Sequence, residues 1–339
     1  MKLRRTLKYF FAVCGIALFI QLIRSVGIAK VLDSIQQIGW GTLAIVLVGG
    51  SIFLVRTLAW RLTLGREYRH LRLQKLFRVY IAAEALGFLF FGGPAVADTT
   101  RVLMLRDAVP TPRVISSVTL DRGLYLVGSV LLLAVTIFLL PLVLEGKATV
   151  PTYDYVIGII FTVMIAALWI AMRKRVRLIS GFFFLVSKFR PFRGWTERKR
   201  AAAAEVEHAM FHFLTTDRPG FWSAFALNLA AHGLAAFEVL LVLWFLNASR
   251  SPLAALFIEG MTKIANISGA VIPGNIGAYE AANMVILNLL GFEAAVGLVL
   301  ALARDVRRLV WVGVGLGLFF ASGFCRVPVA ELQRGPEPA

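Results

Sequence analysis

Long apolar runs dominate the pattern of hydrophobic and polar positions along this chain. A helix that crosses a hydrocarbon core needs roughly 20 apolar residues, or somewhat fewer when flanking Lys and Arg side chains reach the headgroups. Runs of suitable length cover residues 9–23, 40–55, 123–144, 155–172, 221–246 and 309–325. They are continuous and lack the alternation of barrel strands. The pattern therefore predicts an all-α, polytopic membrane bundle with about six to eight spanning helices.

The composition agrees with a membrane protein and excludes other classes. Hydrophobic residues make up 59% of the chain, charged residues 16%, and the mean hydropathy is +0.78. This leaves too little polar surface for a soluble globule. The net charge of +17 could suggest nucleic acid, but the Lys and Arg residues lie at the ends of apolar runs. We expect no nucleic-acid partner.

The sequence also gives little support for a metal or a cofactor. His208 and His212 are four residues apart with Glu205 nearby, but the HExxH order is absent. Cys14 and Cys325 lie within expected helices, where a free thiol behaves as a small hydrophobe. We therefore expect no metal site, no cofactor and no disulfide.

Basic residues are concentrated in segments 2–8, 61–78 and 173–200. Under the positive-inside rule these segments face the cytoplasm. We expect one transmembrane domain over residues 1–325 in the cytoplasmic membrane, with a basic cytoplasmic loop that carries interfacial helices at 173–220. A short tail at 326–339 and the N-terminus would both be cytoplasmic.

Two segments contain apolar pieces that are too short to span and are broken by Gly and Pro. Segment 76–118 includes "LGFLFFGGPAVADTTRVLML", and segment 252–293 includes "ISGAVIPGNIGAYEAANMVI". Paired broken segments in the two halves of a membrane protein favour re-entrant hairpins around a substrate site. The topology predicts that they enter from opposite faces. Two ordinary kinked hairpins are the alternative.

Charged and polar residues inside or beside the apolar runs are the candidates for function. A lone charge at the bilayer centre costs about 2.5–3.5 kcal/mol on insertion scales, so such groups must be paired, hydrated or both. Spacing predicts that Asp98 pairs with Arg101, and Glu259 with Lys263 at the membrane interface. Glu84 either lines a hydrated cavity or lies nearer the headgroups. The whole set is Glu84, Asp98, Arg101, Asp121, Arg122, His232, Glu238, Glu259, Lys263, Glu280, Glu293, Arg304, Asp305, Arg307 and Arg308.

Two motifs resemble the hallmarks of the lysylphosphatidylglycerol synthase transmembrane-region family, whose members are flippase-like membrane proteins. The first is "GGPAVADTTRVLMLRDAVPTPRVISSVTLDRGLYL", and the second is "VIPGNIGAYEAANMVILNLLGFEAAVGLVLALAR". Carried over by position, the resemblance implies Pro94, Asp98, Arg101 and Arg122 in the first motif, and Pro273, Gly274, Gly277, Glu280 and Arg304 in the second. Arg308 is a second candidate for the arginine of the second motif. Ala97-Asp98 stands where the family usually has Gly-Glu after an Arg, which favours Arg101 as the phosphate-binding residue.

The resemblance implies handling of polar lipids at the cytoplasmic membrane, with hopanoid- or glycolipid-associated proteins among the relatives. Our main hypothesis is a protein that binds a polar or anionic lipid and moves it between leaflets. The motif residues and Glu84 would line its cavity, and membrane lipids would be its partners. The alternative is an accessory subunit that presents lipid to a lipid-synthesis enzyme. We expect no enzyme activity, because aminoacyl transfer in larger relatives belongs to a soluble C-terminal domain; a transferase with Glu280 as base is a third hypothesis.

Overall fold

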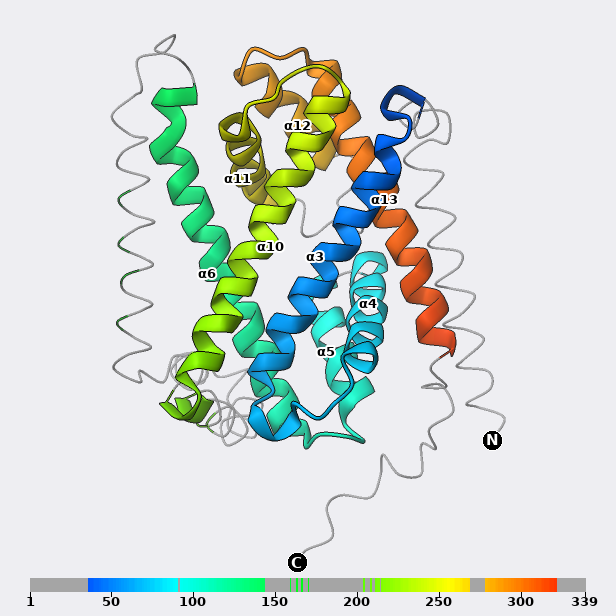
Figure 1. Ribbon diagram of the computed structural model, residues 1–339, viewed down its shortest axis with the longest axis vertical. Helices are drawn as coiled ribbons and strands as arrows, with labels where there is room; N and C mark the ends of the chain where they lie inside the picture. Colours follow the sequence, from blue (N-terminus) through cyan, green and yellow to red (C-terminus); the bar gives the residue numbers. More distant parts are fainter. Residues whose placement is uncertain are drawn as a thin grey trace, which may run out of the picture.

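The computed structural model describes residues 36–90, 92–143, 215–268 and 278–321, together with single positions between 159 and 213. These residues form helices and no strand, as the sequence predicts (Figure 1). The helices are α3 (Gly41–Thr63), η1 (Arg66–Tyr68), α4 (Leu73–Leu89), α5 (Gly93–Leu105), α6 (Thr111–Val143), α10 (Arg218–Phe245), α11 (Pro252–Ser268), α12 (Ala278–Leu289) and α13 (Ala294–Ala321).

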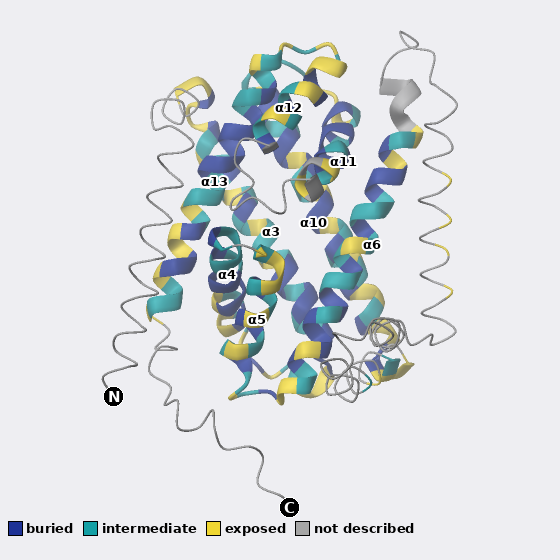
Figure 2. Cartoon of the chain, turned by 180° about the vertical axis from the view of Figure 1, so that it is seen from behind, coloured by how far each residue is buried: buried dark blue, intermediate teal, exposed yellow. Residues whose placement is uncertain are grey.

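Two groups of four helices repeat the same order of long, short, short and long. The first is α3 to α6 and the second is α10 to α13. In Figure 1, α3 runs downward and α6 upward, whereas α10 runs upward and α13 downward. The short pair α4–α5 lies in the lower half and the short pair α11–α12 in the upper half, and the view from behind shows the same separation (Figure 2). The two groups are thus inverted relative to each other, as expected for re-entrant pairs that enter from opposite faces.

The long helices match the predicted spans, although two of them begin earlier than predicted. By length and apolar character, α3, α10 and the Thr111–Phe138 part of α6 could cross a membrane. The prediction for α6 began at residue 123 and that for α13 at residue 309, but the helices begin at Thr111 and Ala294. The charged residues that interrupt the apolar pattern are paired inside the bundle, so the helices continue through them. The predicted spans 9–23 and 155–172 fall outside the described ranges.

The first break has the local chemistry that the sequence indicates. Gly92 has a φ of 71°, in the left-handed region that favours glycine, and Pro94 occupies the first turn of α5. A Cβ atom on Gly87 would lie 2.6 Å from the carbonyl oxygen of Gly93, so only glycine lets α4 and α5 pack this closely. In the second pair, Pro273, Gly274 and Gly277 lie between α11 and α12, outside the described residues.

The two groups of helices exchange contacts symmetrically. The helix α4 packs against α13, where a Cβ atom on Gly315 would lie 2.6 Å from the Ile81 carbonyl oxygen. The helix α11 packs in the same way against α6, where a Cβ atom on Gly260 would lie 2.0 Å from the Thr136 hydroxyl. The first long helices, α3 and α10, pack against each other. Small residues at these crossings allow the close packing that membrane helices use in place of a hydrophobic driving force.

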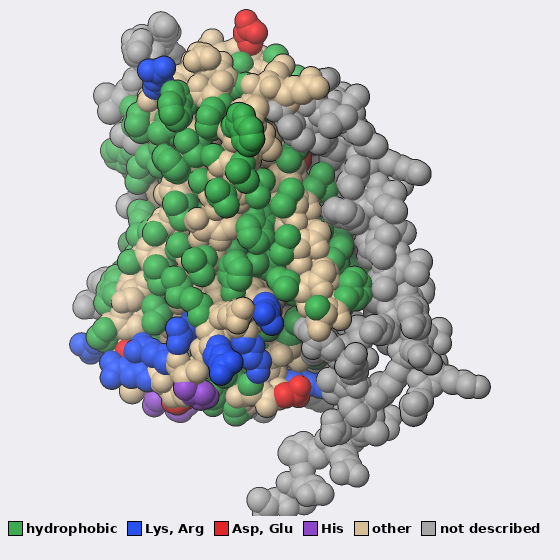
Figure 3. Space-filling view, turned by 45° about the vertical axis from the view of Figure 1, so that its right-hand side comes forward, with side chains coloured by type: hydrophobic (Ala, Val, Ile, Leu, Met, Phe, Trp, Pro, Cys, Tyr) green, Lys and Arg blue, Asp and Glu red, His purple; other side chains and the backbone are tan. Residues whose placement is uncertain are grey.

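The surface fits a bilayer. Trp222 and Trp244 are 55% and 48% exposed near opposite ends of α10. At 1.5 Å per residue they are about 33 Å apart, close to the thickness of a hydrocarbon core, and Trp is enriched at both membrane interfaces. Hydrophobic side chains cover the middle of the face in Figure 3, and Lys, Arg and His gather at its lower end. The α3–α4 connection, with η1, lies at that end (Figure 1).

Candidate functional site

Six charged side chains from all four helices of the first group form what we call the lower cluster. Its most buried members lie near the middle of the bundle, because Asp121, which is fully buried, is 10 residues into α6, or about 15 Å from the start of that helix. The lower cluster consists of Arg56, Glu84, Asp98, Arg101, Asp121 and Arg122.

Arg101 is the centre of the lower cluster. Its side chain is fully buried, with Nη1 3.3 Å from Oδ2 of Asp121 and Nη2 in contact with Oε1 of Glu84. Its guanidinium also lies 4.0 Å from the ring centroid of Tyr80. Arg56 reaches the same Asp121 oxygen at 3.5 Å. In this conformation the guanidinium of Arg101 is enclosed by protein groups.

Arg122 and Asp98 form the accessible edge of the lower cluster. Arg122 donates two hydrogen bonds to Asp98, from Nη2 at 2.6 Å and from Nε at 3.3 Å. The side chains of Arg122 and Asp98 are 23% and 27% exposed, and that of Glu84 is 30% exposed. The predicted pairing of Asp98 with Arg101 is wrong: although three residues apart on α5, they pair with different partners. A headgroup that approaches this edge would meet Arg122 before Arg101.

The second group of helices forms a matching upper cluster, again with a contribution from each helix. Arg304, on α13, lies at its centre. Its guanidinium lies 2.6 Å from Oε2 of Glu259 and donates to the Tyr279 hydroxyl at 2.8 Å and to the Ala235 carbonyl at 2.8 Å. The upper cluster consists of Glu238, Glu259, Lys263, Tyr279, Arg304, Asp305, Arg307 and Arg308.

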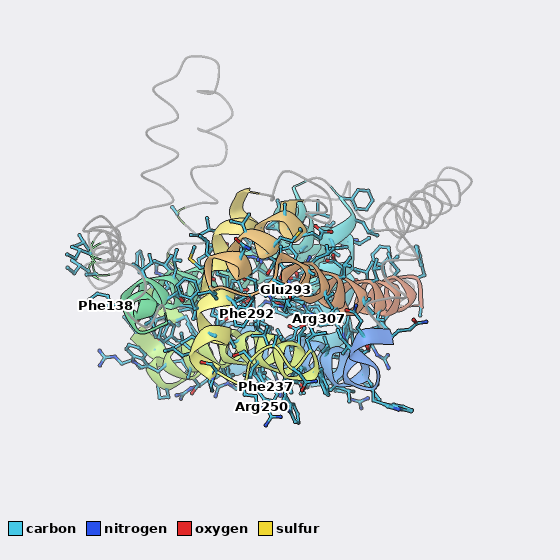
Figure 4. The ribbon with its side chains drawn as sticks, turned by 90° about the horizontal axis from the view of Figure 1, so that it is seen from above. Phe138, Phe237, Arg250, Phe292, Glu293 and Arg307 are labelled. Carbon is cyan, nitrogen blue, oxygen red and sulfur yellow. The ribbon has the colours of Figure 1, made fainter. Side chains whose placement is uncertain are left out.

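The remaining upper-cluster pairs show how closely the charges are matched. Lys263 lies 2.5 Å from Glu259, as the spacing predicts, and the two side chains are 12% and 3% exposed. Glu238 lies 2.8 Å from Arg307. Figure 4, a view from above, shows Arg307 between the helices. The expectation that charges at this depth are paired is confirmed for both clusters.

Arg304 and Arg308, the two candidates for the family arginine, both contact Tyr279. Arg304 bonds to the Tyr279 hydroxyl, whereas the guanidinium of Arg308 lies 4.1 Å from the centroid of the Tyr279 ring. Arg308 also donates to Asp305 at 2.9 Å. Of the two, Arg304 is the more buried. Arg308, one helical turn after Arg304, therefore supplies a second and more accessible cation on the same face of α13.

Tyr125, on α6, joins the two clusters. The Arg56 guanidinium lies 3.7 Å from the centroid of its ring, and the Lys263 ammonium lies 5.8 Å from the same centroid. The ring also stacks on His232 at 4.4 Å. His232 Nε2 lies 3.2 Å from the Tyr125 carbonyl oxygen. Charged and aromatic side chains thus run without interruption from Asp98 to Arg308.

The comparison with known families decides the classification. Residues 7–317 match the family model described as Lysylphosphatidylglycerol synthase TM region. The chain belongs to the lysylphosphatidylglycerol synthase transmembrane-region family. Searches of curated proteins and of solved structures gave no match.

For this member of the lysylphosphatidylglycerol synthase transmembrane-region family, the motif residues occupy equivalent places in the inverted groups. Asp98 and Arg101 lie on α5 and Glu280 on α12, each just beyond a break. Arg122 and Arg304 lie on the following long helices, each beside an aspartate. The two motifs therefore occupy equivalent positions in the two inverted groups of helices.

Sequence reasoning missed several residues that complete this network. Arg56, Tyr80, Tyr125 and Tyr279 were not among the predicted site residues. Arg56 carried the clearest signal, since it is a single cation in the otherwise apolar stretch "FLVRTLAW". The tyrosines carried none, because an isolated Tyr in an apolar helix is commonly a packing residue.

Proposed function

We propose that this protein binds a membrane lipid with a polar or anionic headgroup and moves it between the leaflets of the cytoplasmic membrane. One observation carries the proposal: a continuous network of paired charges crosses the middle of a membrane bundle, and its lower edge is partly exposed. Membership of the family supports a lipid as the ligand class.

The exposed edge of the network needs polar contacts that the hydrocarbon of a bilayer cannot supply. Glu84, Asp98 and Arg122 are each 23–30% exposed at side-chain level. Insertion scales assign about 2.5–3.5 kcal/mol to a charge at the bilayer centre. Contact with water or with a polar headgroup removes that penalty, and Arg122 offers N–H donors that suit a phosphate.

The inverted arrangement supplies a route for the headgroup. The pair α4–α5 reaches the network from the lower end and α11–α12 reaches it from the upper end (Figure 1). Such inverted pairs are typical of transporters that expose one central site to each side in turn. We infer that the headgroup passes along the network while the acyl chains stay in the bilayer.

Proteoliposomes test this proposal. A headgroup-labelled anionic lipid is scored for leaflet exchange with the wild type and with Arg122→Gln, Arg101→Ala and Glu280→Gln. We expect the exchange rate of the Arg122 variant to be at least about tenfold lower than that of the wild type, which corresponds to roughly 1.4 kcal/mol. Arg250→Gln is the control, because Arg250 is exposed at the edge of the bundle (Figure 4).

Equal exchange by all of these proteins would remove the proposed roles of the network residues. If the wild type gives no exchange but co-purifies with a stoichiometric lipid-synthesis enzyme, the accessory-subunit alternative replaces translocation.

A further inference from the structure

The start of α4 carries three exposed basic side chains, Arg72, Lys75 and Arg78, which we call the basic row. They are spaced by three residues, so successive members are neighbours on the surface of the helix. At 1.5 Å per residue, the row extends about 9 Å from the lower end of α4 towards the middle of the bundle (Figure 1). None of these side chains forms an ion pair or a hydrogen bond within the part of the chain that the structure describes.

Other cations at the same end have protein partners. Arg66 and Arg69 lie 3.0 Å and 2.7 Å from the carboxylate of Asp217. Arg113 Nε donates a hydrogen bond to the Leu64 carbonyl at 2.7 Å. These side chains hold the connections at the lower end together. The basic row differs from them, because no described protein group balances its charge.

The charges of the basic row are unfavourable for α4 taken alone. Like charges at this spacing on a helix repel each other. Cations in the first turn of a helix also oppose its dipole, and the first turn of α4 contains no acidic residue that could offset them. An anion that binds beside these side chains removes the repulsion. The row therefore favours an anionic ligand from outside the chain.

The position of the basic row favours a lipid over a soluble anion. Lys75 and Arg78 lie on the side of α4, two and five residues after its start. At the same end, Leu103 of α5 and Ile115 of α6 are 39% and 38% exposed. On the face in Figure 3, hydrophobic side chains lie directly above the basic band. Cations next to an exposed apolar surface match the headgroup and the acyl chains of one lipid, and an anionic leaflet attracts such cations.

We propose that the basic row is a binding surface for anionic phospholipids of the leaflet at the lower end of the bundle. Its N–H groups donate charge-assisted hydrogen bonds to the phosphate oxygens. Arg78 is six residues, or about 9 Å of helix, before Glu84, so the surface is separate from the lower cluster. It holds lipid against the outside of α4 whether or not the protein moves lipid. Each cation near an anionic surface strengthens binding about fivefold, so three give on the order of a hundredfold.

Lipid binding by the full chain in mild detergent tests this surface. Native mass spectrometry measures the affinity for short-chain phosphatidylserine, which is anionic, and for phosphatidylcholine of the same chain length, which has no net charge. We expect the triple variant Arg72→Gln, Lys75→Gln and Arg78→Gln to bind phosphatidylserine at least about tenfold more weakly than the wild type, with unchanged binding of phosphatidylcholine. The double variant Arg72→Lys and Arg78→Lys keeps the charges and should keep the binding.

The matched control removes three charges at scattered places, with Arg106→Gln, Arg218→Gln and Arg250→Gln on one chain, and should bind phosphatidylserine as the wild type does. Every titration is repeated with Arg122→Gln, so that lipid at the exposed edge of the lower cluster is not counted. A wild type that does not distinguish the two lipids, equal losses in the row and control variants, or a loss that disappears with Arg122→Gln would each overturn the surface. Because the titration contains no transport step, its result is independent of the leaflet-exchange experiment.

Discussion

At the residue scale, the bundle resolves the problem of ionised groups in a membrane by pairing them. Arg101 meets two carboxylates and an aromatic ring, and Arg304 meets a carboxylate, a hydroxyl and a carbonyl. Both arginines are buried, so their charges are balanced by protein groups and not by solvent. Breaking a buried pair is more damaging than losing an exposed one, because the partner is left as an uncompensated charge.

We predict that Arg101→Gln destabilises the protein by about 3–5 kcal/mol, because Asp121 and Glu84 lose their closest cation. Thermal unfolding in detergent should show a midpoint lower by several degrees. Arg78→Gln is the control on α4: Arg78 is exposed, and its replacement should change the stability by less than about 0.5 kcal/mol. Matching midpoints for Arg101→Gln and wild type would contradict the structural role of the pair.

A second residue-scale prediction concerns Asp217, the N-cap of α10 at the basic end. Its side chain accepts a hydrogen bond from the Gly220 N–H at 3.2 Å and lies 3.0 Å from Arg66 and 2.7 Å from Arg69. Burial alone would raise the pKa of Asp217, but the hydrogen bonds from Arg66 and Gly220 and the charge of Arg69 hold that pKa below its usual range.

A carboxylate with a lowered pKa stabilises the folded state above the unfolded pKa of about 4, and the stabilisation is lost as the pH falls through the folded pKa. Asparagine can keep the cap hydrogen bond but loses the charge that pairs with Arg66 and Arg69. Asp217→Asn should therefore be less stable than wild type by up to about 1 kcal/mol near neutral pH, and the difference should shrink as the pH is lowered below about 4. Unfolding midpoints across this range measure it. Glu67→Gln, an exposed change in η1, should show a smaller difference near neutral pH. A difference for Asp217→Asn that stays constant across the pH range would exclude the ionised cap.

At the element scale, the short helices are defined by backbone chemistry and by close packing. The pair α4–α5 turns at Gly92, begins again at Pro94, and is held together where Gly87 meets Gly93. This contact brings Glu84 of α4 within reach of Arg101 and Arg122. The geometry of the lower cluster therefore depends on Gly87, although this residue takes part in no ion pair.

We predict that Gly87→Ala destabilises the bundle by about 1–3 kcal/mol, because the added methyl group overlaps the Gly93 carbonyl and forces the backbones apart. Gly233→Ala is the matched control, since a Cβ atom there meets nothing within 4 Å on α10. Helix propensity makes the control neutral or stabilising by up to about 1 kcal/mol. Size-exclusion chromatography after heating in detergent measures how much of each variant stays folded. Equal losses for Gly87→Ala and Gly233→Ala would argue against close α4–α5 packing.

At the scale of the whole molecule, the two groups of helices cross one another and place their charged clusters on either side of Tyr125. The contacts of α4 with α13 and of α11 with α6 bind each re-entrant pair to a long helix of the other group. The ends of the two pairs therefore face opposite sides of the bundle (Figure 1).

This inverted topology predicts the sidedness of labelling. Cysteine introduced at Thr111, an exposed residue at the start of α6, should react from one side of the membrane only. Cysteine at Arg250, exposed before α11, should react from the other side only. Lys75→Cys should behave as Thr111→Cys does, and Glu293→Cys as Arg250→Cys does. Labelling of Thr111 and Arg250 positions from the same side would contradict the inversion.

By itself, the sequence determined the class of the fold and the places where helices break. Apolar runs and Gly–Pro interruptions act locally through hydration and backbone conformation, so the all-α bundle, the break at Gly92–Pro94 and the presence of buried charges could all be predicted. Tertiary structure decided which charges pair, because a guanidinium chooses among carboxylates on other helices by distance in space and not by spacing along its own helix. It also extended α6 and α13 beyond their apolar runs, since ions that are paired inside the protein no longer end a helix. For the same reason only the packed bundle revealed that Tyr125 joins the two clusters.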